Sequence, residues 1–145
     1  MTDQLPKRVI VVLTPGRSGS SLLMNVLGRM GMAMSPEMIP GSIDNPGGFF
    51  EDAEIVKLHK ELIDSLGIHP ALPLPEGWQD FDAVRLAKQK SREILKSRLS
   101  DCPHKIWGFK DPRIPSFLPL WNRVFSAERV VPSFLLALRD PAAVA

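Results

Sequence analysis

The sequence lacks several features that would place it in a particular class of protein. Its 145 residues include a single cysteine, Cys102, which excludes an internal disulfide framework and leaves no need for an oxidising compartment. No apolar run of the sequence approaches the roughly 18 residues of a membrane-spanning helix. The first residues, MTDQLPKR, do not have the pattern of a secretory signal. We therefore expect a cytoplasmic protein without a membrane span.

The chain also has little excess of charge of either sign, since it contains 18 Lys and Arg residues and 16 Asp and Glu residues. The resulting net charge of +2 is too small to indicate nucleic-acid binding on its own, so no nucleic-acid partner is expected. The histidines and the cysteine lack the spacing of metal ligands, and no metal site is expected. Hydrophobic residues make up 44% of the chain, enough for the core of one domain spanning residues 1–145.

The most informative stretch of the sequence, RVIVVLTPGRSGSSLL, lies near the N-terminus. Val9–Leu13 form an unbroken, β-branched apolar run, which is typical of a strand buried on both faces. Pro15 ends that strand, Gly16 and Gly19 lie in a tight loop, and helical composition begins at Ser20. Strand, glycine-containing loop and helix in this order form a phosphate cradle, because loop N–H groups and the helix dipole converge on an anion.

The loop departs from the P-loop of nucleotide triphosphatases, GxxxxGK[ST]. In the aligned segment TPGRSGSS, Thr14 replaces the first glycine and Ser20 replaces the lysine. That lysine normally reaches the β- and γ-phosphates, and the hydroxyl after it holds magnesium. Its loss argues against ATP or GTP cleavage and favours a compact anion bound without a metal. The groups available for that anion belong to Gly16, Arg17, Ser18, Gly19, Ser20 and Ser21.

The remaining sequence predicts alternating helices and strands. Helices are expected at about 20–32, 51–66, 81–99 and 116–127, and strands at 105–109 and 130–138. We expect Asp80 to cap the third helix. This order indicates an α/β domain of three layers, with a parallel sheet flanked by helices.

Ligands of such sheets bind beyond the carboxyl ends of the strands. The loops after Leu13, Phe109 and Leu138 all leave from that edge and all carry an arginine, which indicates one shared anion site. The last predicted strand has no covering helix after it, so we expect these residues to be the N-terminal portion of a longer domain with an incomplete sheet. Its uncovered edge makes association into a homo-oligomer a further expectation.

Four motifs resemble those of a bacterial branch of the PAPS-dependent sulfotransferase family. PGRSGSSLL resembles the family's 5′-phosphosulfate loop, NPGGFFED its NPxGYFE(D) segment, WGFKDPR its WGxKDPR signature and LRDP its RxP strand end. They occur in the family's order and span most of the chain. The resemblance implies a P-loop-like fold and 3′-phosphoadenosine 5′-phosphosulfate (PAPS) as the donor, used without a metal. It also implies sulfuryl transfer to a hydroxyl or amine of a small-molecule or carbohydrate acceptor.

The resemblance also assigns roles in donor binding. Residues 16–21 would wrap the 5′-phosphosulfate, and Arg17 would stabilise charge on the departing oxygen. Arg139 would bind the 3′-phosphate, although the serine that completes this contact in the family would stand at position 147, past the last residue. The alternative for Arg139 is a salt bridge with Asp140 at the start of a helix.

Lys110 and Arg113 follow the second predicted strand. Under the resemblance, Lys110 would neutralise the bridging oxygen or a transferring sulfuryl oxygen, and Arg113 would grip an anionic group of the substrate. The alternative is that both form only a surface ion network with Asp111.

The acceptor needs a general base. Glu51 is the first candidate and Glu37 the second. The alternative for Glu51 or Asp52 is that it only stabilises the start of the following helix through the helix dipole. His59 is a less favoured base, because we expect it to pack along that helix.

Two other functions remain open: a nucleotide or small-molecule kinase with a degenerate P-loop, and a non-catalytic fragment that binds a nucleotide or a partner. Magnesium-dependent ATP binding would favour the kinase, and multiple turnovers would exclude the non-catalytic fragment. A basic row on the third helix could recruit an acidic acceptor, but a solvated helix face is the favoured interpretation. The row consists of Arg85, Lys88, Arg92 and Lys96.

Overall fold

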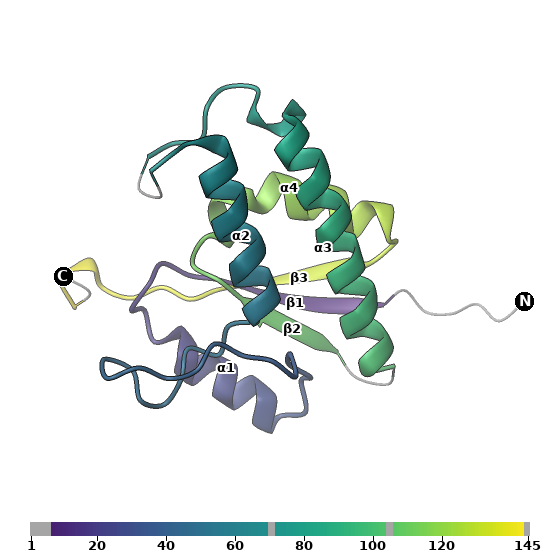
Figure 1. Ribbon diagram of the computed structural model, residues 1–145. Coiled ribbons are helices and arrows are strands. Elements are labelled where there is room, and N and C mark those ends of the chain that lie inside the picture. The colour runs from purple at the N-terminus through teal and green to yellow at the C-terminus, as the bar shows by residue number, and fades with distance from the viewer. Residues whose placement is uncertain (1–6, 70–71, 104–105, 144–145) are drawn as a thin grey trace, which may run out of the picture.

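The computed structural model describes residues 7–69, 72–103 and 106–143. The protein is mixed α/β, with a three-stranded parallel sheet flanked by helices (Figure 1). The strands are β1 (Arg8–Leu13), β2 (Trp107–Lys110) and β3 (Val131–Leu136), in the order β2-β1-β3. The helices are α1 (Ser20–Arg29), α2 (Ala53–Leu66), α3 (Asp82–Asp101) and α4 (Ile114–Ala127), with short 3-10 turns η1 (Trp78–Asp80) and η2 (Pro141–Ala143).

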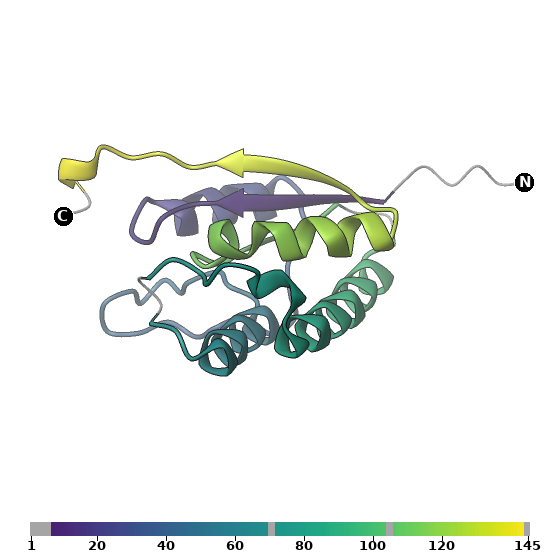
Figure 2. The same cartoon turned by 90° about the horizontal axis from the view of Figure 1, so that it is seen from above.

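Strand β1 lies in the middle of the sheet, and its side chains alternate between two apolar clusters. Val9 and Val11 belong to the main core, which they share with α2, α3 and α4. Val12 packs on the opposite face with residues of α1 such as Met24. This explains why the apolar run of β1 is unbroken: both of its faces are covered. Figure 2 shows α2, α3 and α4 together on one side of β1 and β3.

The parallel register brings the carboxyl ends of all three strands to one edge of the sheet. Val12 pairs with Lys110 of β2, and Leu13 pairs with Leu136 of β3. The loops that follow β1, β2 and β3 therefore leave from the same edge, as the sequence predicted. This edge carries the candidate site.

Several element boundaries differ from the predicted ones. Helix α1 stops at Arg29 rather than near residue 32, and Gly31 follows with a φ of 103°, a left-handed conformation that ends the helix. Asp80 does not cap α3, because it belongs to the 3-10 turn η1 and Phe81 takes the N-cap position. Helix α4 begins at Ile114, two residues earlier than expected.

Two further boundaries concern the last two strands and the helix between them. Pro115 lies in the first turn of α4, where no N–H is needed, so it starts the helix rather than delaying it. Strand β2 begins at Trp107, and the predicted start at Lys105 lies outside the described residues. Strand β3 ends at Leu136, before the predicted end at Leu138.

Strand β3 is the edge of the sheet formed by the described residues. The Val131 N–H donates to the Lys7 carbonyl next to β1, so the following residue, Pro132, has its missing N–H on the outer side. Phe134 and Leu136 are 41% and 63% exposed. The sequence thus places a proline where an edge strand tolerates it, next to side chains that the described residues leave uncovered.

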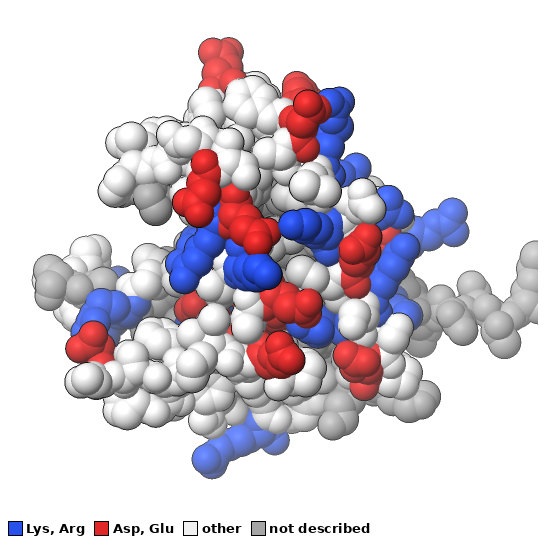
Figure 3. All heavy atoms as spheres, in the orientation of Figure 1, with Lys and Arg blue, Asp and Glu red and all other residues white. Residues whose placement is uncertain are grey.

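The predicted basic row of α3 is largely neutralised by carboxylates. Arg92 and Lys96 both pair with Glu128, and Arg85 pairs with Asp82. Figure 3 shows basic and acidic side chains interleaved over α2 and α3 rather than a field of one sign. The row therefore has the pattern of a solvated helix face. Among the described residues, no helix combines the length and apolar character that a membrane crossing requires.

Candidate functional site

An open cleft of about 670 Å³ lies at the carboxyl edge of the sheet. Its walls come from the loops after the three strands, the first turn of α1 and the segment that leads into α2. The lining residues are Gly16, Arg17, Gly19, Ser20, Ser21, Asp44, Asn45, Phe49, Glu51, Lys110, Pro112, Arg113, Arg139 and Ala143. Most of the residues predicted from the sequence to form a site therefore meet in one place.

The loop after β1 exposes its backbone to this cleft. Arg17 has a φ of 60° and Gly19 a φ of 84°, so both adopt the left-handed conformation. Gly19 is the N-cap of α1 and provides no side-chain cap. No N–H of residues 16–19 donates a hydrogen bond to another described residue. These N–H groups and the positive end of the α1 dipole remain available to an anion.

The three serines of the loop have different surroundings. The Ser18 side chain is buried and shares a hydrogen bond with the Thr14 hydroxyl, so it braces the loop and does not line the cleft. Ser20 and Ser21, at the start of α1, do line it. Ser18 was predicted to contact the 5′-phosphosulfate. Its hydroxyl is taken up by Thr14, so only its backbone N–H is available for an anion in the cleft.

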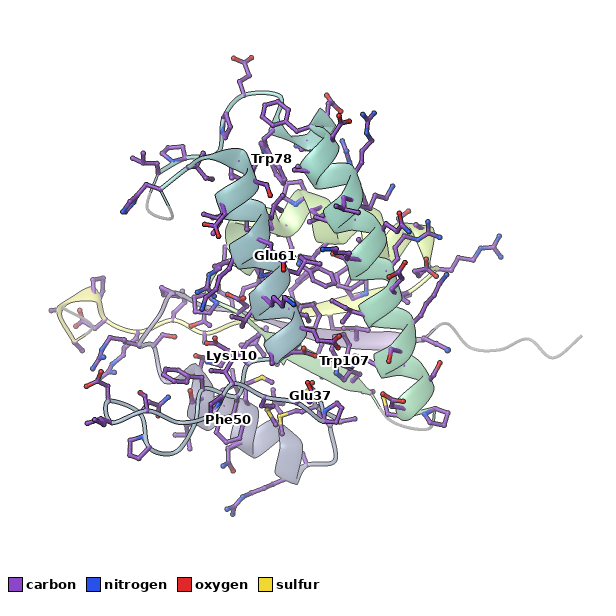
Figure 4. The ribbon with its side chains drawn as sticks, in the orientation of Figure 1. Glu37, Phe50, Glu61, Trp78, Trp107 and Lys110 are labelled. Carbon is purple, nitrogen blue, oxygen red and sulfur yellow. The ribbon has the colours of Figure 1, made fainter. Side chains whose placement is uncertain are left out.

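Lys110, the last residue of β2, connects the loop to the other wall of the cleft (Figure 4). Its ammonium donates to the Ser20 hydroxyl at 3.2 Å and to the Ser21 hydroxyl at 3.5 Å. The same Nζ lies 3.4 Å from Glu51 Oε1. A lysine from the neighbouring strand thus lies next to the loop, which has a serine at position 20 where a P-loop has a lysine. This pairing is invisible in the local sequence.

Two carboxylates line the cleft: Asp44 is exposed, and Glu51 is the buried one. Only 9% of the residue is exposed, and burial raises the pKa of its carboxyl above the ordinary value; Lys110 offsets part of this rise. A buried carboxyl with a raised pKa next to a cation has the properties of a general base. Glu37, the second candidate, is exposed and does not line the cleft; its backbone carbonyl accepts from the Ala53 N–H.

Asp52, directly after Glu51, stabilises the start of α2, which is the structural role that the sequence allowed for either residue. Its Oδ1 accepts hydrogen bonds from the backbone N–H groups of Glu54 and Ile55 and so caps α2. The buried guanidinium of Arg98 donates to both of its oxygens, at 2.8 and 3.2 Å. Because Asp52 caps the helix, Glu51 is left to face the cleft.

Asp52→Ala is expected to lower the free energy of unfolding by about 3–5 kcal/mol, since it leaves Arg98 buried without its main partner. It also removes the cap of α2, which adds about 1 kcal/mol. The matched control is Glu54→Ala, which removes the half-exposed second partner of Arg98 and should cost under about 1 kcal/mol. Urea denaturation of the two variants and the wild type measures these losses of stability. Equal losses in the two variants would contradict this account.

Arg113 lines the cleft, as expected for a residue that binds the substrate, and it also forms the ion pair with Asp111 that was its alternative role. Its guanidinium donates to Asp111 Oδ1 at 2.9 Å, and its backbone N–H donates to the same oxygen at 2.8 Å. Burial alone would raise the pKa of Asp111, but hydrogen bonds from His59 and Arg113 lower it below the ordinary value. Asp111 is therefore an ionised, fully buried anchor for a guanidinium that faces the cleft.

Arg139, after β3, lies against the loop after β1. Its Nη1 donates to the Arg17 carbonyl oxygen at 3.3 Å. Within the described residues no ion pair joins Arg139 to Asp140; the Asp140 carboxylate accepts from Ala142 N instead. The guanidinium thus remains at the rim of the cleft.

Several lining residues were not predicted, and three of them, Asp44, Asn45 and Phe49, lie in the segment before α2. The segment around them is rich in glycine and proline, and no periodicity marks which side chains face inward. No group of acidic, histidine and cysteine side chains suited to a metal occurs among the residues that the structure describes. Comparisons of the chain with protein-family models, with curated proteins and with solved structures found no match.

Proposed function

We propose that this protein is a PAPS-dependent sulfotransferase that transfers a sulfuryl group to a hydroxyl or amine, on a three-layer, P-loop-like fold. One observation carries the proposal: a single ammonium, that of Lys110, lies within 3.5 Å of the Ser20 and Ser21 hydroxyls and of the buried Glu51 carboxylate. A cation for the departing oxygen and a base for the acceptor therefore share one cleft. The four sequence motifs that resemble the family all contribute to its lining.

The donor is held from two sides in this proposal. The free N–H groups of residues 16–19 and the hydroxyls of Ser20 and Ser21 surround the 5′-phosphosulfate. Arg139 already lies against the loop, at the rim where a second phosphate of the donor can reach it. The acceptor occupies the side of the cleft lined by Asn45, Phe49 and Arg113.

The reaction is an in-line displacement at sulfur. Glu51 accepts the proton of the acceptor hydroxyl or amine while the acceptor atom forms its bond to sulfur. The bond from sulfur to the bridging oxygen breaks, and its electron pair stays on the 5′-phosphate. Lys110, Arg17 and the loop N–H groups neutralise the charge that develops there. Atoms and charge balance without a metal.

The activity is expected to fall as the pH decreases through the raised pKa of Glu51, because only the ionised carboxylate accepts a proton. A profile of log kcat against pH should therefore show a limb of unit slope whose midpoint lies above the ordinary glutamate value. Lys110→Met removes the neighbour that lowers this pKa and should move the limb to higher pH. A limb that does not move would contradict the assignment of Glu51.

A kinase is the second candidate, and one observation favours it. Lys110 restores an ammonium next to the loop hydroxyls, which is the group that the loop lost relative to a P-loop. Magnesium separates the two candidates, since phosphoryl transfer from ATP depends on it and the proposed sulfuryl transfer does not.

The proposed function is tested by PAPS turnover. The protein is incubated with PAPS and a panel of small hydroxyl and amine acceptors, including sugars, and the release of 3′,5′-adenosine bisphosphate is measured. Release that depends on an acceptor and survives chelation of magnesium is expected. Magnesium-dependent ATP turnover in the same panel, with no release from PAPS, would overturn the proposal in favour of the kinase.

A further inference from the structure

A chain of buried hydrogen bonds lies behind the cleft and ends at Arg113. Trp121 Nε1 in α4 donates to His59 Nε2 in α2 at 2.9 Å. His59 Nδ1 lies 2.9 Å from Asp111 Oδ2, in the loop after β2. The other oxygen of Asp111 accepts from the backbone and the guanidinium of Arg113. The side chains of His59 and Asp111 are fully buried, and so is Trp121.

The chemistry of these groups fixes the proton positions. An indole N–H can only donate, so His59 Nε2 must carry a lone pair. The proton of the neutral ring therefore resides on Nδ1, from which it is donated to Asp111. An imidazolium would place an N–H against the indole N–H of Trp121. His59 is thus held as a single neutral tautomer with its donor aimed at the carboxylate.

Packing also prevents the imidazole from turning. It stacks on Phe117, with ring centroids 5.2 Å apart, and meets Trp121 edge-on. The orientation of the Asp111 carboxylate is consequently set from α2 and α4, through bonds that leave Oδ1 to Arg113. The Arg113 side chain itself is 30% exposed, and without this anchor it would sample many rotamers at the cleft wall.

We propose that His59 is a positioning residue: held in one tautomer by Trp121, it orients the Asp111 carboxylate so that this carboxylate holds the Arg113 guanidinium at the cleft as a preformed anion-binding group. Only one of the guanidinium nitrogens, Nη1, bonds to Asp111, so donors remain for a sulfuryl group or an anionic acceptor. That ligand assignment rests on the proposed function; the positioning of Arg113 does not. Preorganisation of this kind improves binding because the side chain is ordered before the ligand arrives.

Two substitutions of His59 separate its two hydrogen bonds. In His59→Asn, the amide nitrogen reaches the place of Nδ1, so the bond to Asp111 is kept and the one to Trp121 is lost. In His59→Gln, the amide oxygen reaches the place of Nε2, so the bond to Trp121 is kept and the one to Asp111 is lost. Both variants remove an aromatic ring from the same site, and comparable losses of thermal stability are expected.

The first readout is side-chain NMR of arginine in the free protein. The Arg113 guanidinium should show hindered rotation and slow proton exchange in the wild type and in His59→Asn, and should lose both in His59→Gln. The same behaviour of Arg113 in the two variants would overturn the proposal. This readout needs no ligand, so it remains decisive even if the protein binds no PAPS and the proposed function fails.

The second readout is the dissociation constant of PAPS, measured by calorimetry. His59→Gln and Arg113→Ala should each weaken binding about tenfold, and their double variant should be no weaker than either alone. His59→Asn should remain within about threefold of the wild type. Additive losses in the double variant would contradict a role of His59 that acts through Arg113.

A measurement on the wild type alone keeps the proposal testable if both His59 substitutions prevent folding. In ¹⁵N spectra His59 should be the tautomer with its proton on Nδ1, the nitrogen that faces Asp111, because Nε2 accepts from Trp121. A wild-type ring with its proton on Nε2 would overturn the tautomer argument and the proposal with it.

Discussion

Lys110→Met is expected to lower kcat for sulfuryl transfer by about 10²–10³-fold, the usual effect of removing one group that stabilises developing charge. Methionine keeps the length of the side chain and removes its charge. In the wild type, the Lys110 residue is only 3% exposed and its ammonium lies next to the loop hydroxyls, where water screens its charge poorly. The loss should therefore be larger than for an exposed lysine.

The same variant should also weaken binding of 3′,5′-adenosine bisphosphate, by about 10–100-fold, because a hydrogen bond to a charged group contributes about 1.5–3 kcal/mol. Turnover of PAPS and calorimetry with the bisphosphate measure the two effects. Lys57→Met is the control, since Lys57 is an exposed residue of α2 that pairs with Glu61 and does not line the cleft. Wild-type turnover by Lys110→Met would remove Lys110 from the mechanism.

Glu51→Gln is expected to lower kcat by about 10²-fold or more, because glutamine cannot accept the acceptor's proton. Binding of 3′,5′-adenosine bisphosphate should stay within about threefold of the wild type, since Lys110 and the loop remain. Glu37→Gln is the matched comparison: it makes the same change at the exposed candidate that the structure places outside the cleft. A loss in Glu37→Gln with full activity in Glu51→Gln would transfer the role of base to Glu37.

Stability gives an independent check on Glu51. A carboxyl whose pKa is raised by folding contributes stability below its unfolded pKa, and this contribution is lost as the pH rises through its folded pKa. Above the folded pKa, the ionised Glu51 therefore weakens the folded state. Glu51→Gln should melt at the same temperature as the wild type or higher at pH 7, in contrast to its loss of activity. A lower melting temperature would show that Glu51 is a structural residue.

The local sequence was sufficient for much of the fold. The β-branched run from Arg8 to Leu13 gave the bounds of β1, since an unbroken apolar run of that length fits a strand covered on both faces. The apolar spacing up to Leu66 and the following Gly67 located α2 and its end, where Gly67 adopts a left-handed conformation. The start of α4 was predicted too late because Pro115 was not recognised as a residue of the first helical turn.

The site was predictable only as far as chain order and motifs allowed. Glu51 and Asp52 are adjacent acidic residues before one helix, and only the backbone geometry decides that Asp52 caps it while Glu51 faces the cleft. The pairing of Lys110 with Ser20 spans 90 positions and depends on β1 lying beside β2. His59 was expected to pack on its helix, and it does, but nothing in the local sequence indicated its bond to Asp111.

The central claim is that the cleft binds the nucleotide of a sulfuryl donor, and a thermal-shift titration tests it most directly. The protein is titrated with 3′,5′-adenosine bisphosphate and, separately, with ADP in the presence and absence of magnesium. At 100 times its dissociation constant the bisphosphate should add about 2.7 kcal/mol of stability, a shift of roughly 5–10 °C for a chain of this size. Arg139→Ala should reduce that shift. Stabilisation by ADP with magnesium alone, or by neither nucleotide, would contradict the account.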